Sequence, residues 1–469
     1  MYLASRRSTA IERDPDDAES ARPSTIDETA EQGSREDADG GVLDPDTEER
    51  TGAEGNVVAL GVTSMFTDIS SEMIGSVLPL YLTLLYGFTP LQFGVFDGVY
   101  QGMAALVALG AAVVADRRRR LKEMAGAGYG LSTASTLGLV AVQGAWFGSV
   151  FFLYLDRLGK GIRTAPRDAI ISLSVMPARL GRAFGTHRAF DTVGAVAGPV
   201  IASIVLARNV NGYQSVFMVG FFSSMIGLAS LIFFVDGRRK VIPVGAGSRD
   251  GTVDHAPKAR RRFDRTRTDV KLLLAHPRFR LALLLGGGLA LLSPGDGLLY
   301  LTFQRDAALS NAQFPLLYFG GSLVFLTASY PVGRLADRIG RWRVFVAGEA
   351  MLIGVFVVLG SGLRGPLALL ALVAMVGGRY AATDGVLMAL ASSALPSSLR
   401  ATGLGLLVVV LALGHLVAST VFGSLWGSVG STETARIFAI VLTGVTLAGA
   451  LLLKHRRALV DVGAREERW

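Results

Sequence analysis

The sequence predicts an all-α membrane protein with twelve transmembrane helices in two pseudo-symmetric six-helix halves. Its 469 residues are 51% hydrophobic with a mean hydropathy of +0.44, too apolar for a soluble chain of this length. Apolar runs of about 20 residues recur, each long enough to cross a bilayer as a helix. A charged turn at 333–343 lies between two such runs, with a weaker copy at 112–120. Asp116 and Asp337 in these turns are 221 positions apart, which indicates an internal duplication.

The predicted spans follow one another with short connectors, as expected of antiparallel neighbouring helices. In chain order they are residues 57–86, 91–115, 124–143, 147–173, 182–206, 213–236, 279–303, 313–336, 342–362, 366–393, 400–425 and 433–453. The longest connector is polar and rich in Arg, so we expect it to link the two halves. The predicted domains are therefore an acidic tail at 1–54, halves at 55–236 and 279–455, the cytoplasmic linker at 237–278 and a cytoplasmic tail at 456–469.

Residues 1–54 hold 16 Asp and Glu residues against 6 Arg and show no apolar periodicity. This composition is typical of a disordered segment. It has no basic start followed by an apolar core, so it does not read as a signal peptide. We expect an extension without a function of its own, and a regulatory tail is the alternative.

Positive charge is distributed unevenly among the connectors. Lys and Arg concentrate after the even-numbered spans, in the linker and after the last span. The opposite connectors are nearly free of them, with Arg208, Arg305 and Arg364 as the main exceptions. Because cytoplasmic loops carry the excess of Lys and Arg, both termini are expected in the cytoplasm. The prediction is a multi-pass protein of the cytoplasmic (inner or plasma) membrane, embedded in the lipid bilayer.

The two halves also correspond beyond the charged turns. Pro177 and Pro396 are 219 positions apart, and Gly185 and Gly405 are each followed by another Gly nine positions later. Parallel repeats of this kind occur in secondary transporters, whose sites lie between the repeats near the middle of the membrane. The sequence thus predicts a solute site between the halves and rocking between two access states.

Residues 57–453 resemble the major facilitator superfamily, and the turn Gly333-x-Leu-Ala-Asp337-Arg338-x-Gly340-Arg341 fits its signature closely. The first-half copy keeps Asp116-Arg117 but has Ala112 where Gly is usual. The resemblance implies a monomer with a cytoplasmic latch formed by Asp116, Arg117, Gly333, Asp337, Arg338, Gly340 and Arg341. Charge-assisted bonds between Asp and Arg at helix ends can break when the halves rock. The alternative is that these Arg residues only anchor the topology.

The fifth predicted span resembles the antiporter signature of the same family, which is found mostly in exporters. The matching residues are Gly185, Gly194, Gly198 and Pro199, while Ala202 and Ser203 replace the final Gly pair. Small residues allow close helix packing, and Pro removes a backbone donor and bends the helix. The resemblance favours export, and helix packing without bearing on direction is the alternative.

Ionisable groups inside a span are costly and therefore indicate function. Asp68 and Glu72 are four residues apart in the first span and share one helix face. Two carboxylates close together at low dielectric favour one shared proton, which suits proton coupling. Pairing with basic residues of the fourth span and a solvated helix end are the alternatives.

The fourth span carries the densest group of charges. Asp156, Lys160, Arg163 and Arg167 recur at a spacing that places them on one face, beside Arg157. Such a stripe must face a wet cavity or other charges. The cations either bind an anionic solute through planar guanidinium groups or neutralise carboxylates in a network that titrates during transport. A third reading has only the first part of the stripe deep in the membrane. The proton-coupling candidates are Asp68, Glu72, Asp156 and Asp191.

Further candidates for a substrate cavity lie in other spans. Asp97 and Gln101 share a face of the second span, and Asp296 follows Pro294-Gly295, which predicts a broken helix. Arg379 and Asp384 lie in the tenth span, the counterpart of the fourth. Together with the fourth-span cations, the cavity candidates are Asp97, Gln101, Arg157, Lys160, Arg163, Arg167, Asp296, Arg379 and Asp384.

No catalytic residue, metal site or cofactor is predicted. The chain has no Cys, its five His lack metal-ligand spacing, and it has no G-x-x-x-x-G-K-[ST] string. The basic excess lies in cytoplasmic connectors and does not support nucleic-acid binding. The sequence predicts a secondary transporter, not an enzyme, that exchanges a small organic solute for protons, with export favoured. Proton-linked import of an organic or phosphorylated anion is the alternative, and a transporter-like sensor is the weakest reading.

Overall fold

The computed structural model describes residues 45–118, 120–142, 144–176, 179–209, 211–236, 272–307, 309–396 and 399–466. Their side chains are described except at 45–54, 112–118, 278, 306, 401 and 450–466. Every regular element in these ranges is a helix, which confirms the predicted all-α class. Most of the predicted acidic tail and linker lies outside the described residues.

Six helices and a π-helical turn cover the six predicted spans of the first half. They are α1 (Pro45–Leu80) with η1 (Tyr81–Leu85), α2 (Pro90–Arg118), α3 (Leu121–Ala141), α4 (Trp146–Ser174), α5 (Leu180–Arg208) and α6 (Tyr213–Phe234). Pro79, Pro166 and Pro199 lie inside α1, α4 and α5. Each of these positions lacks a backbone N–H to donate to the preceding turn.

The second half repeats the pattern with one interruption. Its helices are α8 (Pro277–Ala290), α9 (Asp296–Ala307), α10 (Pro315–Ile339), α11 (Arg341–Ser361), α12 (Pro366–Ser393), α13 (Arg400–Val429) and α14 (Ser431–Glu466). The predicted seventh span, 279–303, consists of the two short helices α8 and α9. Pro294 and Gly295 separate them, because Pro removes a helical N–H and Gly is a poor helix former.

Nine helices among the described residues are long and apolar enough to cross a membrane. The other predicted spans do not reach the required length and hydropathy. These are α3, α4 and the α8–α9 pair. α3 is rich in Gly, Ser and Thr, α4 carries the charged stripe, and α8 and α9 are each too short. A helix in the interior of a bundle does not need a fully apolar surface, because neighbouring helices cover its polar groups. The count of twelve crossings stays a prediction.

The helix limits differ from the predicted domain limits at both ends of the chain. α1 begins at Pro45, inside the stretch assigned to the acidic tail, and α14 continues to Glu466, inside the stretch assigned to the C-terminal tail. Polar residues extend both helices beyond the apolar runs, so hydropathy alone places the limits too far inward. Contacts divide the chain into Met1–Thr47 and the compact unit Glu48–Trp469.

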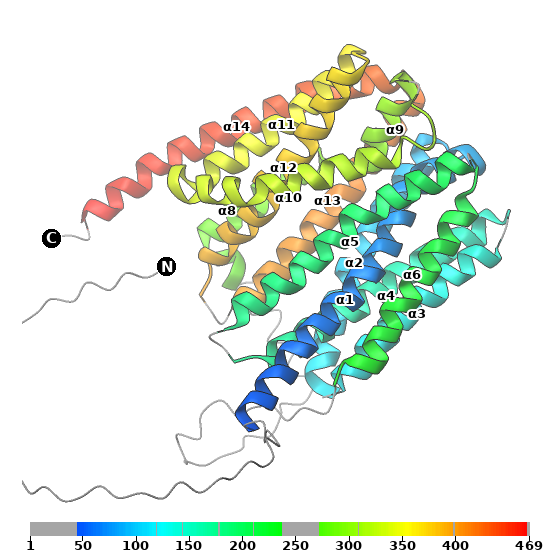
Figure 1. The fold of residues 1–469 in the computed structure, drawn as a ribbon. Coiled ribbons are helices and arrows are strands. Elements are labelled where there is room, and N and C mark those ends of the chain that lie inside the picture. Colours follow the sequence, from blue (N-terminus) through cyan, green and yellow to red (C-terminus); the bar gives the residue numbers. More distant parts are fainter. Residues whose placement is uncertain are drawn as a thin grey trace, which may run out of the picture. The chain divides into compact units, whose positions relative to one another are not determined.

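Two pairs of long helices join the halves within the second unit. α2 packs on α13 and α5 packs on α10, while α3–α4 and α11–α12 are contacts within a half. Figure 1 shows α5 beside α10 and α2 beside α13, although each pair is far apart in the sequence. Each contact between the halves therefore joins the second predicted span of one repeat to the fifth predicted span of the other.

Small residues allow α2 and α13 to approach closely. A Cβ atom at Gly94 would overlap the backbone oxygen of Ser419, and one at Gly98 would lie 2.6 Å from Cα of Leu416. From the other helix, a Cβ atom at Gly423 would overlap the backbone oxygen of Pro90. Gly is thus required on both sides of this contact, as is common where membrane helices pack backbone to backbone.

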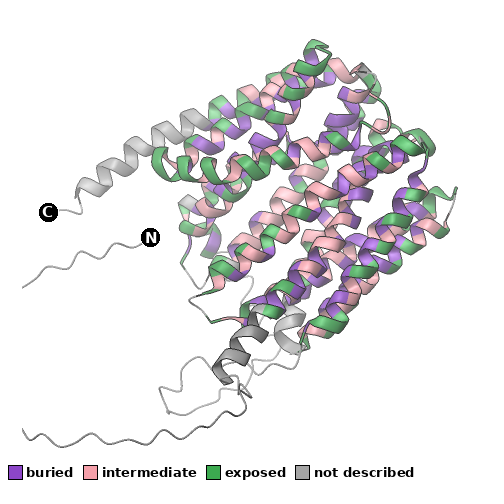
Figure 2. Cartoon of the chain, in the orientation of Figure 1, coloured by how far each residue is buried: buried purple, intermediate pink, exposed green. Residues whose placement is uncertain are grey.

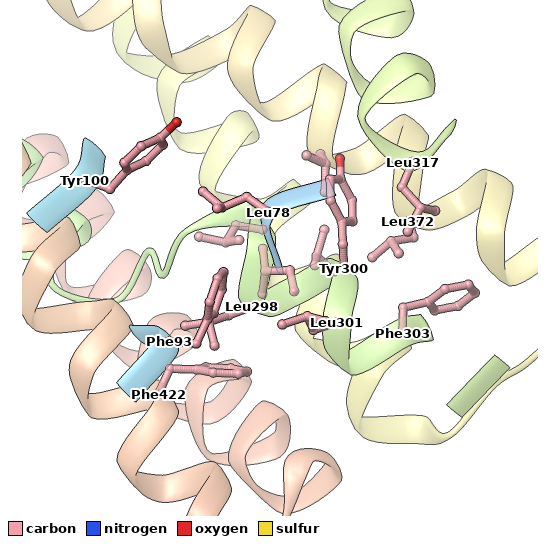
Figure 3. Packing of buried hydrophobic residues seen from close by; sticks show 14 of the residues in the cluster. Leu78, Phe93, Tyr100, Leu298, Tyr300, Leu301, Phe303, Leu317, Leu372 and Phe422 are labelled. Carbon is pink, nitrogen blue, oxygen red and sulfur yellow. The ribbon is translucent and has the colours of Figure 1, made fainter. Parts of the chain in front are cut away.

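Buried residues lie between the helices, and many exposed residues on the outer faces are large and apolar (Figure 2). Phe233, Phe234 and Ile440 are among the most exposed of these, as expected of side chains that face lipid. The main core cluster joins both halves. In Figure 3, Phe93 of α2, Phe422 of α13 and Leu298 of α9 belong to this cluster.

Candidate functional site

A polar cavity of about 340 Å³ lies between the two halves. Helices α1, α2 and α4 of the first half and α9, α10, α12 and α13 of the second contribute to its wall. Its polar lining residues are Glu72, Asp97, Tyr100, Gln101, Arg157, Lys160, Asp296, Tyr318, Tyr380, His415 and Ser419. Two halves that move against each other would therefore change the shape of this cavity.

Asp97 of α2 reaches across the boundary between the halves. Its side chain is buried, with the residue 5% exposed, and its carboxylate contacts the backbone of Gly295. The N–H of Gly295 donates to the Ser419 hydroxyl at 2.9 Å, and that hydroxyl in turn lies beside the Asp97 carboxylate with Gln101. The Oδ2 atom of Asp97 nevertheless has no hydrogen-bond partner among the described residues.

The break between α8 and α9 places Asp296 at the start of α9. The Tyr380 hydroxyl donates to Asp296 Oδ2 at 3.0 Å, whereas the buried Oδ1 lacks a partner in the described part of the chain. The break also frees backbone carbonyls, and His415 Nδ1 lies 2.7 Å from the carbonyl oxygen of Ser293. Asp296 and Asp97 lie within electrostatic reach of each other, so the cavity holds two acidic groups that repel.

The basic residues of the cavity come from α4. The Arg157 guanidinium donates to the Tyr100 hydroxyl and lies over that ring at 4.0 Å from its centroid. Asp156 Oδ2 is 3.8 Å from Arg157 Nε, so the charge of this arginine is already compensated by its neighbour in sequence. Glu72 and Lys160 complete this side of the wall.

Arg163 pairs with Asp68 outside the cavity. Its Nη2 atom is 3.6 Å from Asp68 Oδ1, its Nη1 donates to the Ser132 hydroxyl at 3.0 Å, and its guanidinium lies over the Tyr129 ring. A close approach of α3 and α4 makes this possible, since a Cβ atom at Gly159 would lie 2.7 Å from the backbone oxygen of Gly128. Asp68 thus lies beside a basic residue of the fourth span, and its part in proton coupling stays a prediction.

The end of the α4 stripe belongs to a second polar network. Arg167 Nη1 donates to the Ser64 hydroxyl at 3.3 Å, and Ser64 lies 3.0 Å from His187 Nε2. The other ring nitrogen of His187 is 3.4 Å from Asp191 Oδ2. Arg167 also pairs with Asp168 at 2.9 Å. Asp191 thus reaches the stripe through a histidine and a serine.

A buried pair of charged residues lies in the second half. Glu349 of α11 is 3% exposed and Arg379 of α12 is 6% exposed, and their charges interact. Glu349 Oε2 and Arg379 Nε both lack hydrogen-bond partners among the described residues. Asp384 interacts electrostatically with the same arginine. None of the three is among the residues that line the cavity.

The charged turn of the second half is open to solvent. Asp337 pairs with Arg341 one turn later at 3.3 Å, with side chains 69% and 40% exposed. Gly340 separates α10 from α11 at φ +101°, a conformation that favours Gly. The side chains of Asp116 and Arg117 lie outside the described residues. The latch between helix ends therefore stays a prediction.

Two glycines of the predicted antiporter motif pack α5 against α1. A Cβ atom at Gly194 would lie 3.0 Å from Cβ of Asp68, and one at Gly198 would lie 2.8 Å from Cβ of Glu72. The motif thus sets the position of both first-span carboxylates. At Gly185 a Cβ atom would meet nothing within 4 Å.

Some of the predicted cavity residues line this cavity and others do not. Asp97, Gln101, Arg157, Lys160 and Asp296 line the cavity, together with Glu72, which was a proton-coupling candidate. The other proposed cavity residues, Arg163, Arg167, Arg379 and Asp384, do not line it. Arg163 and Arg167 take part in polar networks of the first half, Arg379 is buried within electrostatic reach of Glu349, and Asp384 is exposed.

Sequence reasoning also missed several residues. Tyr318, Tyr380, His415 and Ser419 line the cavity, and single polar residues in apolar helices gave no signal to distinguish them. Glu349 did have a recognisable signal in the sequence, since an ionisable group inside an apolar span marks a functional or paired position. The same criterion that selected Asp97 would have found it.

The profile of the Major Facilitator Superfamily matches residues 60–419. The chain belongs to the major facilitator superfamily. An uncharacterized MFS-type transporter of Methanocaldococcus jannaschii is 31% identical over 400 residues, which cover 85% of this chain and 94% of the relative. The family and this relative identify a multi-pass membrane transporter rather than an enzyme.

Solved structures share the fold at low sequence identity. A POT family transporter in complex with a thioalcohol-conjugated peptide has a TM-score of 0.67 and 13% identity, covering 85% of this chain and 96% of its own. The nucleoside transporter NupG has a TM-score of 0.65 and 14% identity, covering 85% and 99%. These likenesses show the MFS fold in this chain.

Proposed function

We propose that this MFS transporter exchanges a small organic solute for protons through the cavity between its halves. The observation that carries the proposal is that carboxylates from both halves, Glu72, Asp97 and Asp296, line one cavity. Carboxylates can bind either a proton or a basic group of a solute. Rocking of the halves would expose such groups to each side of the membrane in turn.

Glu72 is the carboxylate best placed to carry the proton. It lies in the cavity wall within electrostatic reach of Arg157, whereas Asp68 faces Arg163 and Asp191 faces His187. Asp156 faces Arg157 and is not in the wall. A proton on Glu72 would change the charge of the cavity without first breaking an ion pair.

Export is the direction that the fifth-span motif favours. Gly194 and Gly198 hold α5 against the turn of α1 that bears Asp68 and Glu72. Movement of α5 during rocking would therefore displace both carboxylates together. We propose proton entry coupled to solute exit across the cytoplasmic membrane, with both termini in the cytoplasm as the distribution of Lys and Arg suggests.

Proton-linked import of an organic or phosphorylated anion is the second candidate. Arg157 and Lys160 in the cavity wall favour it, because a guanidinium and an ammonium are natural partners of carboxylate and phosphate. It is weakened by the positions of Arg163 and Arg379 outside the cavity, where Arg163 pairs with Asp68 and Arg379 interacts electrostatically with Glu349.

The test is metabolite profiling of cells and medium with the protein overproduced, deleted, or replaced by its Glu72→Gln form. Export by this protein predicts a compound enriched in the medium only with the active protein, and Glu72→Gln should abolish that enrichment. Glu433→Gln is the matched control, because Glu433 is an exposed residue paired with Arg436. A compound depleted from the medium and enriched in cells would establish import, and enrichment unchanged by Glu72→Gln would reject Glu72 as the proton carrier.

A further inference from the structure

The cavity contains more acidic than basic groups that are free to meet a solute. Glu72, Asp97 and Asp296 lie in its wall against Arg157 and Lys160. Arg157 is already neutralised by Asp156 and hydrogen-bonded to Tyr100, which leaves Lys160 as the one uncompensated cation among the described lining residues. The free charge of the wall is therefore negative.

Two carboxylate oxygens in this wall lack donors. Asp97 Oδ2 and Asp296 Oδ1 are buried and have no hydrogen-bond partner among the described residues. The other oxygen of each carboxylate has neighbouring side chains as donors. At Asp296, the Tyr380 hydroxyl donates to Oδ2. A buried carboxylate oxygen without a donor is costly, so N–H or O–H groups of a bound molecule would stabilise these two atoms.

Aromatic rings line the same cavity as these two carboxylates. Phe93 and Tyr100 come from α2, Tyr318 from α10 and Tyr380 from α12. Ring faces attract cations and cover the apolar body of an organic molecule. An acidic pair set among rings fits a cation with both N–H donors and an apolar part.

We propose that the solute is an organic amine whose protonated ammonium group binds between Asp97 and Asp296. The ammonium donates N–H bonds to Asp97 Oδ2 and Asp296 Oδ1, and its organic part lies against the rings. This inference rests on the proposed function for the cavity and names its solute class. It requires N–H groups, so a quaternary ammonium of the same shape leaves the two oxygens unsatisfied.

The test measures ligand binding to the purified full-length protein in detergent. The readout is the shift that each ligand causes in the midpoint of thermal unfolding. The probes are phenethylamine and butylamine, each compared with its trimethylammonium analogue, its alcohol and a carboxylate of similar length. We expect the amines to raise the midpoint, and the analogues to have little effect. Asp97→Asn and Asp296→Asn should each weaken amine binding about 10-fold to 100-fold, the loss of one charge-assisted hydrogen bond. Glu433→Gln should bind as the unaltered protein does.

The outcomes separate this inference from the proposed function. Stabilisation by the carboxylates alone, equal stabilisation by the quaternary analogues, or no stabilisation by either amine would overturn it. Each variant is first checked by gel filtration, and the two Asp variants give independent readings if one fails to fold. Binding involves no proton gradient, so amine binding in a protein that moves no protons would support the inference and contradict proton coupling.

Discussion

The carboxylate of Asp97 lies against the backbone of Gly295, and these two residues come from different halves of the transporter. Gly295 also donates its N–H to Ser419 of α13, the helix that packs on the helix of Asp97. The broken helix between α8 and α9 is thus held against the first half at the wall of the cavity. A change in the charge or contents of the cavity therefore acts directly on the contact between the halves.

Replacing Gly295 by Ala should loosen this contact. The added Cβ atom would overlap Asp97 Oδ2, and overpacking of this kind costs about 1–3 kcal/mol. We expect a lower midpoint of thermal unfolding in detergent. Gly75→Ala is the matched control, because a Cβ atom there meets nothing within 4 Å. Equal midpoints for the two variants would show that the contact at Gly295 carries no strain.

Asp68→Asn should uncouple transport from the proton gradient. Asp68 faces Arg163 at 3.6 Å, and a neutral amide would leave this cation without its counter-charge, one helical turn from the proposed proton carrier Glu72. We expect loss of uphill, pH-gradient-driven transport in vesicles, while exchange of the solute found by profiling continues. Uphill transport at an unchanged rate would remove Asp68 from the coupling network and leave it a structural partner of Arg163.

The pair Glu349–Arg379 should matter for stability even though it lies outside the cavity. Removing one of two buried charges that interact is strongly destabilising, because the other charge stays buried without compensation. We therefore expect Glu349→Leu or Arg379→Met alone to lower the midpoint of unfolding strongly. The double variant should recover much of the loss. If its loss equals the sum of the single losses, the two charges do not act as a pair.

Asp337→Asn separates the predicted latch from a merely stabilising pair. The Asp337–Arg341 pair is exposed, and such pairs contribute about 0–1 kcal/mol. The midpoint of unfolding should hardly change, while the initial rate of transport should fall if the turn controls rocking. An unaltered rate would favour the alternative that the Arg residues of this turn only anchor the topology.

Helix positions followed from the sequence because hydropathy and length determine which segments can cross a bilayer. The break at Pro294-Gly295 was also predictable, since both residues disfavour a helix. The limits at Pro45 and Glu466 were not, because polar residues continue those helices beyond the apolar runs.

The ion-pair and hydrogen-bond partners of the charged residues could not be predicted, because they depend on how the helices pack. Helical spacing placed Asp156, Lys160, Arg163 and Arg167 on one face, yet only Lys160 of these lines the cavity. The close contact of α3 with α4 at Gly128 and Gly159 directs Arg163 to Ser132 and Asp68 instead. The contact of Asp97 with Gly295 depends on how the halves meet, which no local pattern encodes.

The measurement that tests the central claim most directly is thiol labelling of Gly75→Cys in membrane vesicles. The chain has no Cys, so the added thiol is unique, and Gly75 lines the cavity with room for a side chain. Gly130→Cys is the control, since it also has room but lies outside the cavity. If the cavity is the water-filled solute site, a membrane-impermeant trimethylammonium methanethiosulfonate should label Gly75→Cys faster than its sulfonate counterpart does, and should label Gly130→Cys little. No labelling of Gly75→Cys, or faster labelling by the sulfonate, would contradict an acidic transport cavity between the halves.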